Sequence, residues 1–336
     1  RMNENGEIVG IYEVGNEPLS VVTARGTAWI TQYGADQVIN LAPDGETIGT
    51  YPTDDGPVGI GFDGQLIWIA NADAGTVTTL TLDGDLVDSF AVGGSPTTLE
   101  FDGEHMWVAN TSDQWVAKMS SDGAVLNRVD LDGEPAGMAF DGDHMWVAVN
   151  SNARLLKIDD TGWVVLDVAT RDQPVGLGFD GSSIWVAHEN DDLMRFNMSG
   201  DPIGKVEMPG ATLLAFDGEY MWATPNAPEP SVAKVGPISL VPFYFEPVTT
   251  AVRLSQPSGS DAEDQPAPSA VTGPTPTEPE VFTIDTTTGL SRPTSVVSTG
   301  EHIWVTNYGD DTVHKLDLNG NLVERYEGFA GPLDIL

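Results

Sequence analysis

Short runs of apolar residues recur along this chain at a fixed spacing, separated by turns that contain Gly and Asp. The clearest run, residues 57–71, reads Pro-Val-Gly-Ile-Gly-Phe-Asp-Gly-Gln-Leu-Ile-Trp-Ile-Ala-Asn, and near copies cover almost the whole sequence. Its tryptophan recurs every 39 residues over five copies, then after 37 and after 82 residues. The seven members are Trp29, Trp68, Trp107, Trp146, Trp185, Trp222 and Trp304. A period near 40 with one tryptophan per copy predicts repeated four-stranded blades.

Each repeat predicts four short strands, which in the second copy are residues 58–62, 66–71, 77–82 and 86–92. The dipeptides Asp63-Gly64 and Asp83-Gly84 lie between paired runs, where glycine closes a tight hairpin. Strands this short cannot bury both faces alone, so neighbouring sheets must stack around an axis. The pattern therefore predicts an all-β propeller whose tryptophans are wedged between adjacent blades.

The repeated motif Phe-Asp-Gly-x-x-x-Trp-Val-Ala-Asn, followed by a Val-rich strand and Gly-x-Pro, resembles the bacterial YVTN/NHL-type β-propeller repeats. It is also similar to the repeats of the virginiamycin B lyase-like superfamily. The resemblance covers nearly all of the chain except residues 238–292. It implies a propeller fold but does not specify a function, because the same repeats serve enzymes, binding modules and surface proteins.

The domain organisation that we predict is a ring with one interruption. Residues 1–237 hold blades one to six, residues 238–292 form an insertion, and residues 293–336 hold the last blade and close the ring. Within the insertion, residues 255–280 are a low-complexity segment rich in Pro, Ser, Thr and acid, a composition that does not pack.

Two interpretations of the insertion differ in the number of blades. Either residues 281–287 supply the fourth strand of blade six, or Pro247 begins a degenerate eighth repeat. We favour seven blades, because a blade without its tryptophan and middle strands leaves a gap and exposed edges.

Both ends carry surplus strands, since residues 6–14 read as a fourth strand and residues 332–336 as the opening of a further repeat. They look trimmed from a longer chain, and residues 1–4 are not a signal sequence. An unpaired strand is a template for another chain. We therefore predict self-assembly through a terminal strand, with the alternative that such a strand adds a fifth strand to its own blade or frays.

The composition is strongly acidic, with 51 Asp and Glu against 14 Lys and Arg and a formal net charge of -37. Such a surface repels phosphate, which excludes nucleic acid and anionic membranes as partners. It suits a halophilic or marine source, because salt screens the repulsion. Bound divalent cations, calcium or magnesium, are the competing explanation.

The chain has no cysteine, which excludes disulfides and thiolate metal sites, and no run of 18 apolar residues that would insert into a membrane.

A four-stranded meander sends its loops alternately to two faces of the ring. The Asp-Gly hairpins share one face, which is regular from repeat to repeat. The second-to-third loops and the Gly-x-Pro connections share the other, the variable loop face. Variable loops on a rigid scaffold are where binding sites occur, so we expect the site there.

The candidate site residues on the variable loop face are His188 and three arginines. The position three residues after the tryptophan is Asn or Gln in four repeats but His188 in the fifth, where an imidazole suits acid–base or metal chemistry. Arg154, Arg171 and Arg292 fall in loops of the same face and together suit an anionic ligand. In the alternative, each arginine pairs with a nearby acid.

Three further histidines, His105, His144 and His302, each precede their tryptophan by two residues. Equivalent positions in different blades lie far apart around a ring, whereas metal ligands converge on one ion. We therefore assign no metal ligands to this chain.

The sequence contains no catalytic motif, so it leaves open whether the protein is an enzyme. We predict an extracellular or cell-surface module that binds a protein or small-molecule ligand, or assembles, through the variable loop face. The alternative comes from the resemblance: the lyase-like superfamily implies a metal-assisted activity that uses a histidine and magnesium on one propeller face, and His188 is the residue that matches.

Overall fold

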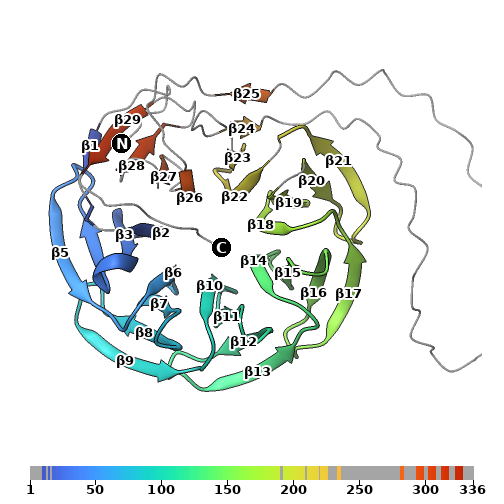
Figure 1. The fold of residues 1–336 in the computed structure, drawn as a ribbon, viewed down its shortest axis with the longest axis horizontal. Coiled ribbons are helices and arrows are strands. Elements are labelled where there is room, and N and C mark those ends of the chain that lie inside the picture. Colours follow the sequence, from blue (N-terminus) through green and yellow to red (C-terminus); the bar gives the residue numbers. More distant parts are fainter. Residues whose placement is uncertain are drawn as a thin grey trace, which may run out of the picture.

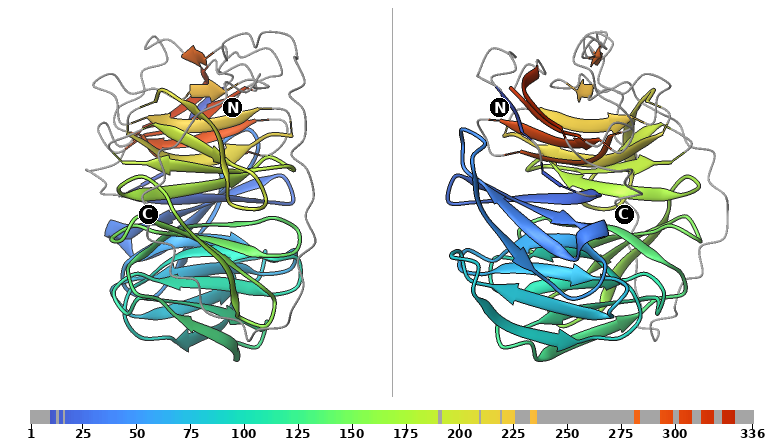
Figure 2. Two further views of the ribbon diagram at one scale, coloured as in Figure 1. Left: turned by 90° about the vertical axis from the view of Figure 1, so that its right-hand side faces the viewer. Right: turned by 60° about the vertical axis from the view of Figure 1, so that its left-hand side comes forward.

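Seven sheets are arranged in a ring in the computed structural model of this chain (Figure 1). The structure describes residues 10–12, 14–15, 17–189, 192–208, 210–218, 220–225, 233–235, 281–283, 293–298, 302–307, 312–317 and 322–327. Side views show a disc of stacked blades (Figure 2). The prediction of an all-β propeller is confirmed, with seven sheets rather than eight among the described residues.

Each blade is a four-stranded antiparallel meander. Blade one contains β2 (Pro18–Ala24), β3 (Thr27–Gln32), β4 (Gln37–Leu41) and β5 (Thr47–Pro52), with a short 3-10 turn, η1 (Tyr33–Ala35). Blade two contains β6 (Pro57–Phe62), β7 (Ile67–Asn71), β8 (Thr76–Leu80) and β9 (Leu86–Ala91). Blade three contains β10 (Pro96–Phe101), β11 (Met106–Asn110), β12 (Trp115–Met119) and β13 (Val125–Asp130). Blade four contains β14 (Pro135–Phe140), β15 (Met145–Val149), β16 (Arg154–Ile158) and β17 (Val164–Ala169).

The remaining blades follow the same order. Blade five contains β18 (Pro174–Phe179), β19 (Ile184–His188), β20 (Leu193–Phe196) and β21 (Pro202–Val206). Blade six contains β22 (Ala211–Phe216), β23 (Met221–Pro225), β24 (Ala233–Val235) and β25 (Val281–Thr283). Blade seven contains β26 (Pro293–Ser298), β27 (Ile303–Asn307), β28 (Thr312–Leu316) and β29 (Leu322–Glu327), and β1 (Gly10–Tyr12) joins it. The strand bounds predicted for the second repeat differ from β6–β9 by at most two residues.

Blade six is completed across the long insertion. Strand β25 pairs antiparallel with β24, with Val281 opposite Val235. This is the interpretation in which the segment starting at residue 281 supplies the fourth strand. The low-complexity segment 255–280 and the rest of residues 236–280 lie outside the described residues.

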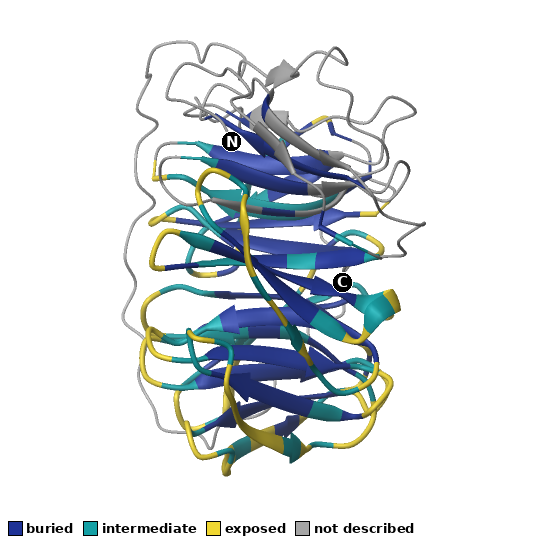
Figure 3. Cartoon of the chain, turned by 90° about the vertical axis from the view of Figure 1, so that its left-hand side faces the viewer, coloured by how far each residue is buried: buried dark blue, intermediate teal, exposed yellow. Residues whose placement is uncertain are grey.

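The seven repeat tryptophans form the contacts between blades. Trp68 packs against Leu99 and Met106 of the next blade, and Trp304 packs against Val21 and Ile30 of blade one, which closes the ring. All seven are at most 3% exposed. Figure 3 shows that burial follows the inner strands while exposed residues lie on the outside. The wedge prediction is therefore confirmed, and each indole contributes ~3 kcal/mol or more through burial.

The aspartate of the first hairpin does more than form a turn. In five blades its Oδ2 accepts a hydrogen bond from the repeat tryptophan five residues later, at 2.7 to 2.9 Å. The residue opposite the tryptophan on the third strand is Lys or Arg in blades three to seven: Lys118, Lys157, Arg195, Lys234 and Lys315. Hairpin, indole and cation thus form one repeated unit that holds the second and third strands together.

Blade one breaks this rule. Ala24 occupies the aspartate position, Asn40 lies opposite Trp29, and Trp29 Nε1 has no hydrogen-bond partner among the described residues. The ring of Trp29 instead stacks on Tyr51, with centroids 5.3 Å apart.

The N-terminal strand helps to close the ring. Strand β1 lies parallel to β29, with Gly10 opposite Glu324, and also pairs with β28. Val14, which follows it, is fully buried between blade seven and blade one with Trp304. The sequence allowed this N-terminal strand to pair with another molecule, to add a fifth strand to its own blade or to fray. In the structure, β1 is the fifth strand of blade seven. Residues 332–336, the other surplus strand, lie outside the described residues.

Candidate functional site

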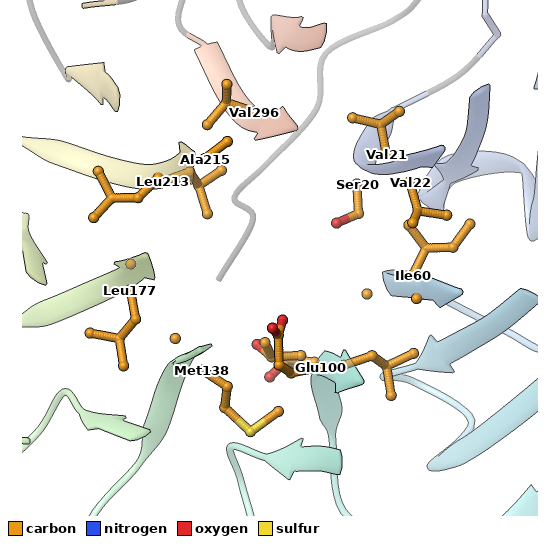
Figure 4. Close-up of a pocket in the computed structure, with 18 of the residues that line it drawn as sticks. Ser20, Val21, Val22, Ile60, Glu100, Met138, Leu177, Leu213, Ala215 and Val296 are labelled. Carbon is orange, nitrogen blue, oxygen red and sulfur yellow. The ribbon is translucent and has the colours of Figure 1, made fainter. Parts of the chain in front are cut away.

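A cavity of about 430 Å³ lies at the centre of the ring, lined by residues of the first strand of every blade (Figure 4). Each first strand pairs with its second strand on one side only, so its other edge, which belongs to no strand ladder of its sheet, faces the centre. The cavity has a volume typical of small-molecule sites, which range from about 300 to 1,000 Å³. The centre of the propeller is therefore the candidate functional site.

Close approach of neighbouring first strands makes the wall continuous. At Gly59, an added Cβ would lie 2.3 Å from the Thr97 carbonyl oxygen of the next blade, so only glycine fits. The equivalent residue of blade three is Thr98, whose hydroxyl donates to the Ala136 carbonyl at 2.7 Å. These contacts hold neighbouring first strands close together.

Glu100 on β10 is the only ionisable residue among the described residues that line the cavity. Its side chain lies in the channel wall beside Met138 (Figure 4). Burial raises the pKa of the Glu100 carboxyl to about 7, against the lowering effect of a hydrogen bond from the Phe140 backbone N–H. The channel thus combines backbone and apolar walls with one carboxyl group that changes charge near neutral pH.

The connections that surround the channel on the variable loop face are acidic. Their carboxylates in the described residues are Glu17, Asp36, Asp54, Asp55, Asp73, Asp113, Asp132, Glu134, Asp172, Glu189, Asp192 and Glu207. Arg171 is the one basic residue in the same described loops. The field at this end of the channel therefore attracts cations and repels anions.

His188 is fully buried at the end of β19. Its Nδ1 donates to the Asp192 carbonyl at 2.9 Å, and its Nε2 is hydrogen-bonded to the Thr170 hydroxyl at 2.7 Å. The ring therefore connects two loops of the variable face. Its acid–base and ligand-binding roles stay predictions, and they need this ring to become exposed.

The three candidate arginines do not converge in the described part of the chain. Arg154 Nε donates to Asp167 at 2.6 Å within blade four, as the ion-pair alternative expected. Arg171 lies in the connection from β17 to β18, and Arg292 lies outside the described residues. An anion site built from all three stays a prediction.

The repeat histidines remain on separate blades. His105 and His144 each lie beside the hairpin aspartate of their own blade, with Nδ1 to Oδ1 distances of 3.9 and 3.8 Å. Among the described residues, no group of three or more His, Asp or Glu side chains is placed to hold a metal ion. In the same part of the chain, no helix is long and apolar enough to span a membrane.

Sequence reasoning missed Glu100, although the repeat contains a signal. The equivalent residues of the other blades are Val22, Gly61, Ala139, Gly178, Ala215 and Val297. A carboxyl group among small and apolar residues departs from the repeat more strongly than His188 does. Only the closed ring, however, shows that this position faces a cavity.

Comparison with protein-family models and with curated protein sequences finds no match. Solved structures do match. Virginiamycin B lyase from Staphylococcus aureus superposes with a TM-score of 0.66 at 15% identity, over 92% of this chain and 97% of the lyase. Its catalytically inactive variant with quinupristin gives 0.69 at 14% identity, over 93% and 99%. BamB from Moraxella catarrhalis gives 0.59 at 15% identity, over 93% and 86%. At this identity the likeness is one of fold, and the chain is a β-propeller similar in architecture to virginiamycin B lyase and to BamB.

Proposed function

We propose that this chain is a binding module that takes a small-molecule ligand into its central channel from the variable loop face. The observation that carries the proposal is the cavity of about 430 Å³ inside a rigid ring. Its wall offers hydrogen-bonding backbone edges beside apolar side chains, the combination that small-molecule sites use. The acidic loops around the channel favour ligands that are neutral or positively charged.

An extracellular or cell-surface location is part of the proposal. It is supported by the Pro/Ser/Thr/acid-rich composition of residues 255–280, which is typical of exposed linkers and stalks. Antibodies raised against the folded protein should bind intact cells of the source organism. Labelling that requires permeabilised cells would overturn the location and leave the binding proposal standing.

Ligand binding can be tested with the methyl groups of the methionines. Met138 lines the channel, whereas Met119 is buried on the third strand of blade three, away from it. Titration with 1-hexanol, a neutral probe with an apolar chain, should shift the Met138 ε-methyl NMR signal and leave that of Met119 in place. Absence of any shift at Met138 up to the solubility limit of the probe would overturn the proposal.

The second candidate is a metal-assisted lyase with its site on the same face. The observation in its favour is the structural likeness to virginiamycin B lyase over 93% of the chain. In this version His188 would act with a divalent cation, and its burial must be relieved when substrate binds. Incubation with quinupristin and magnesium distinguishes the two functions, since cleavage would establish the lyase and intact quinupristin would leave the binding module.

A further inference from the structure

Glu100 departs from the repeat, and the fold does not require a glutamate at this position. Six other blades hold Val, Gly or Ala at this position, and each of these residues lies opposite its repeat tryptophan as Glu100 lies opposite Trp107. In blades two and five, an added Cβ at Gly61 or Gly178 would approach a methionine of the next blade within 3.1 Å or less. The position is therefore crowded, and a glutamate fits there only because its carboxyl group extends along the channel wall.

The surroundings of Glu100 leave its charge uncompensated. Its described neighbours in the cavity wall are Leu99, Phe101 and Met138, and no ion pair among the described residues includes it. The Phe140 backbone N–H donates the hydrogen bond that stabilises the carboxylate. A partly buried carboxyl group with one donor, and no cation beside it among the described residues, is unfavourable for folding, and such perturbed groups cluster at functional sites.

The shape and charge of the channel limit what that ligand can be. An anion is excluded by Glu100 and by the acidic loops at the entrance. A bare metal ion needs several oxygen or nitrogen ligands, and Glu100 is alone among the described ionisable groups of the wall. A cationic head attached to an apolar body satisfies the carboxylate and the apolar walls together.

We propose that Glu100 is the recognition group for a small organic cation, an alkylammonium with an apolar body, bound in the central channel. This inference rests on the proposed function, namely that the channel is the ligand site. The ammonium group donates to the Glu100 carboxylate, and the alkyl chain lies along the side chains of Leu99 and Met138. The acidic loops raise the local concentration of the cation at the entrance.

The test compares hexylammonium with 1-hexanol, two probes of the same length that differ in charge. Both are titrated at pH 8 and 0.15 M NaCl, where an alkylamine with a pKa near 10.4 is protonated and surface attraction is screened. We expect the wild-type protein to bind hexylammonium at least about tenfold more tightly than hexanol, read from the Met138 methyl shift. The preference should disappear in Glu100→Gln, while hexanol binding stays unchanged and shows that the channel is intact.

The matched control is Glu104→Gln, which removes one carboxylate from an exposed turn of the same blade. It should keep the full preference, so that a general effect of net charge is separated from the effect of Glu100. Equal binding of the two probes to wild-type protein, or an unchanged preference in Glu100→Gln, would overturn the inference and leave the channel as a ligand site. If neither probe shifts Met138, the proposed function fails and the inference fails with it.

Discussion

Trp146 Nε1 donates a hydrogen bond to Asp141 Oδ2 at 2.8 Å, while Asp141 Oδ1 accepts the backbone N–H groups of Asp143 and His144. Lys157 Nζ lies 3.1 Å from the same Oδ2 and 5.0 Å from the centre of the Trp146 ring. One carboxylate therefore fixes the hairpin, orients the indole that separates two blades, and holds a cation. Burial opposes ionisation of Asp141, but these hydrogen bonds prevail and lower the pKa of its carboxyl.

Asp141→Asn should destabilise the protein by about 2–4 kcal/mol, because Lys157 and the indole lose a charged acceptor in a buried site. Since the folded-state pKa lies below the ordinary value of 3.8, this contribution is present above pH 3.8 and is lost as the pH falls through the folded-state pKa. Urea unfolding between pH 3 and pH 7 measures it. The control Asp143→Asn, at a side chain that is 87% exposed, should change stability by less than about 0.5 kcal/mol. Equal effects of the two substitutions would contradict the network.

Glu100 predicts the opposite pH dependence. Its pKa is raised from 4.5 to about 7 in the fold, so the folded state holds more protons than the unfolded state between these values. The free energy of unfolding should therefore fall as the pH rises from 4.5 to 7, by about 1–3 kcal/mol relative to Glu100→Gln. Parallel stability curves for the two proteins across this range would show that Glu100 is solvated like a surface carboxylate.

How far the sequence predicts the structure depends on whether a feature lies within one repeat. The spacing of Trp68 and the Asp63-Gly64 dipeptide determine the strands, since both act locally, and strands β6–β9 follow the expected bounds. The second role of Asp63, as acceptor for Trp68, depends on the finished hairpin geometry and was not predicted.

Features that depend on the closed ring could not be predicted from the sequence pattern. The burial of His188 results from Thr170 and Asp192, which belong to two different loops. Glu100 becomes a channel residue only when seven first strands surround one axis. Candidate residues chosen for their chemical type, such as His188 and Arg154, therefore do not belong to the cavity wall.

The role of the N-terminal segment in ring closure can be tested at Val14, which is fully buried between blades seven and one. Val14→Ala should destabilise the protein by about 1–3 kcal/mol through the cavity that it leaves. Val165→Ala, at an outer-strand residue that is 50% exposed, is the matched control and should have little effect. Thermal unfolding measures both.

Light scattering on the same samples addresses self-assembly through terminal strands. With β1 paired to its own blade, we expect wild-type protein and Val14→Ala to be monomers. Oligomers that form in proportion to the loss of stability in Val14→Ala would mean that a released terminal strand pairs with a neighbouring molecule.

The net charge of -37 predicts a response to salt. If repulsion among about 50 carboxylates limits stability, molar NaCl should raise the melting temperature progressively, because screening weakens that repulsion. If specific calcium sites are the reason for the charge, calcium between micromolar and millimolar concentration should produce the same rise. Indifference to both salts would reject both explanations.

Residues 255–280 lie outside the described residues, and their composition predicts that the ring does not need them. A Pro/Ser/Thr/acid-rich segment cannot bury enough apolar surface to offset its chain entropy. Deleting it should leave the melting temperature within a few degrees, as measured by calorimetry. A fall of more than about 10 °C would mean that the segment belongs to a blade.

The position of the lysines opposite the tryptophans has a practical consequence for handling the protein. Four of the five lysines, Lys118, Lys157, Lys234 and Lys315, occupy that cross-strand position. Lys118 and Lys315 are 8% and 2% exposed, and the fifth, Lys205, contacts Asp192. Amine-directed dyes, cross-linkers and trypsin therefore find Lys118 and Lys315 shielded on the native ring. Reagents that couple to carboxyl groups are the ones suited to attaching this protein to a surface or a label.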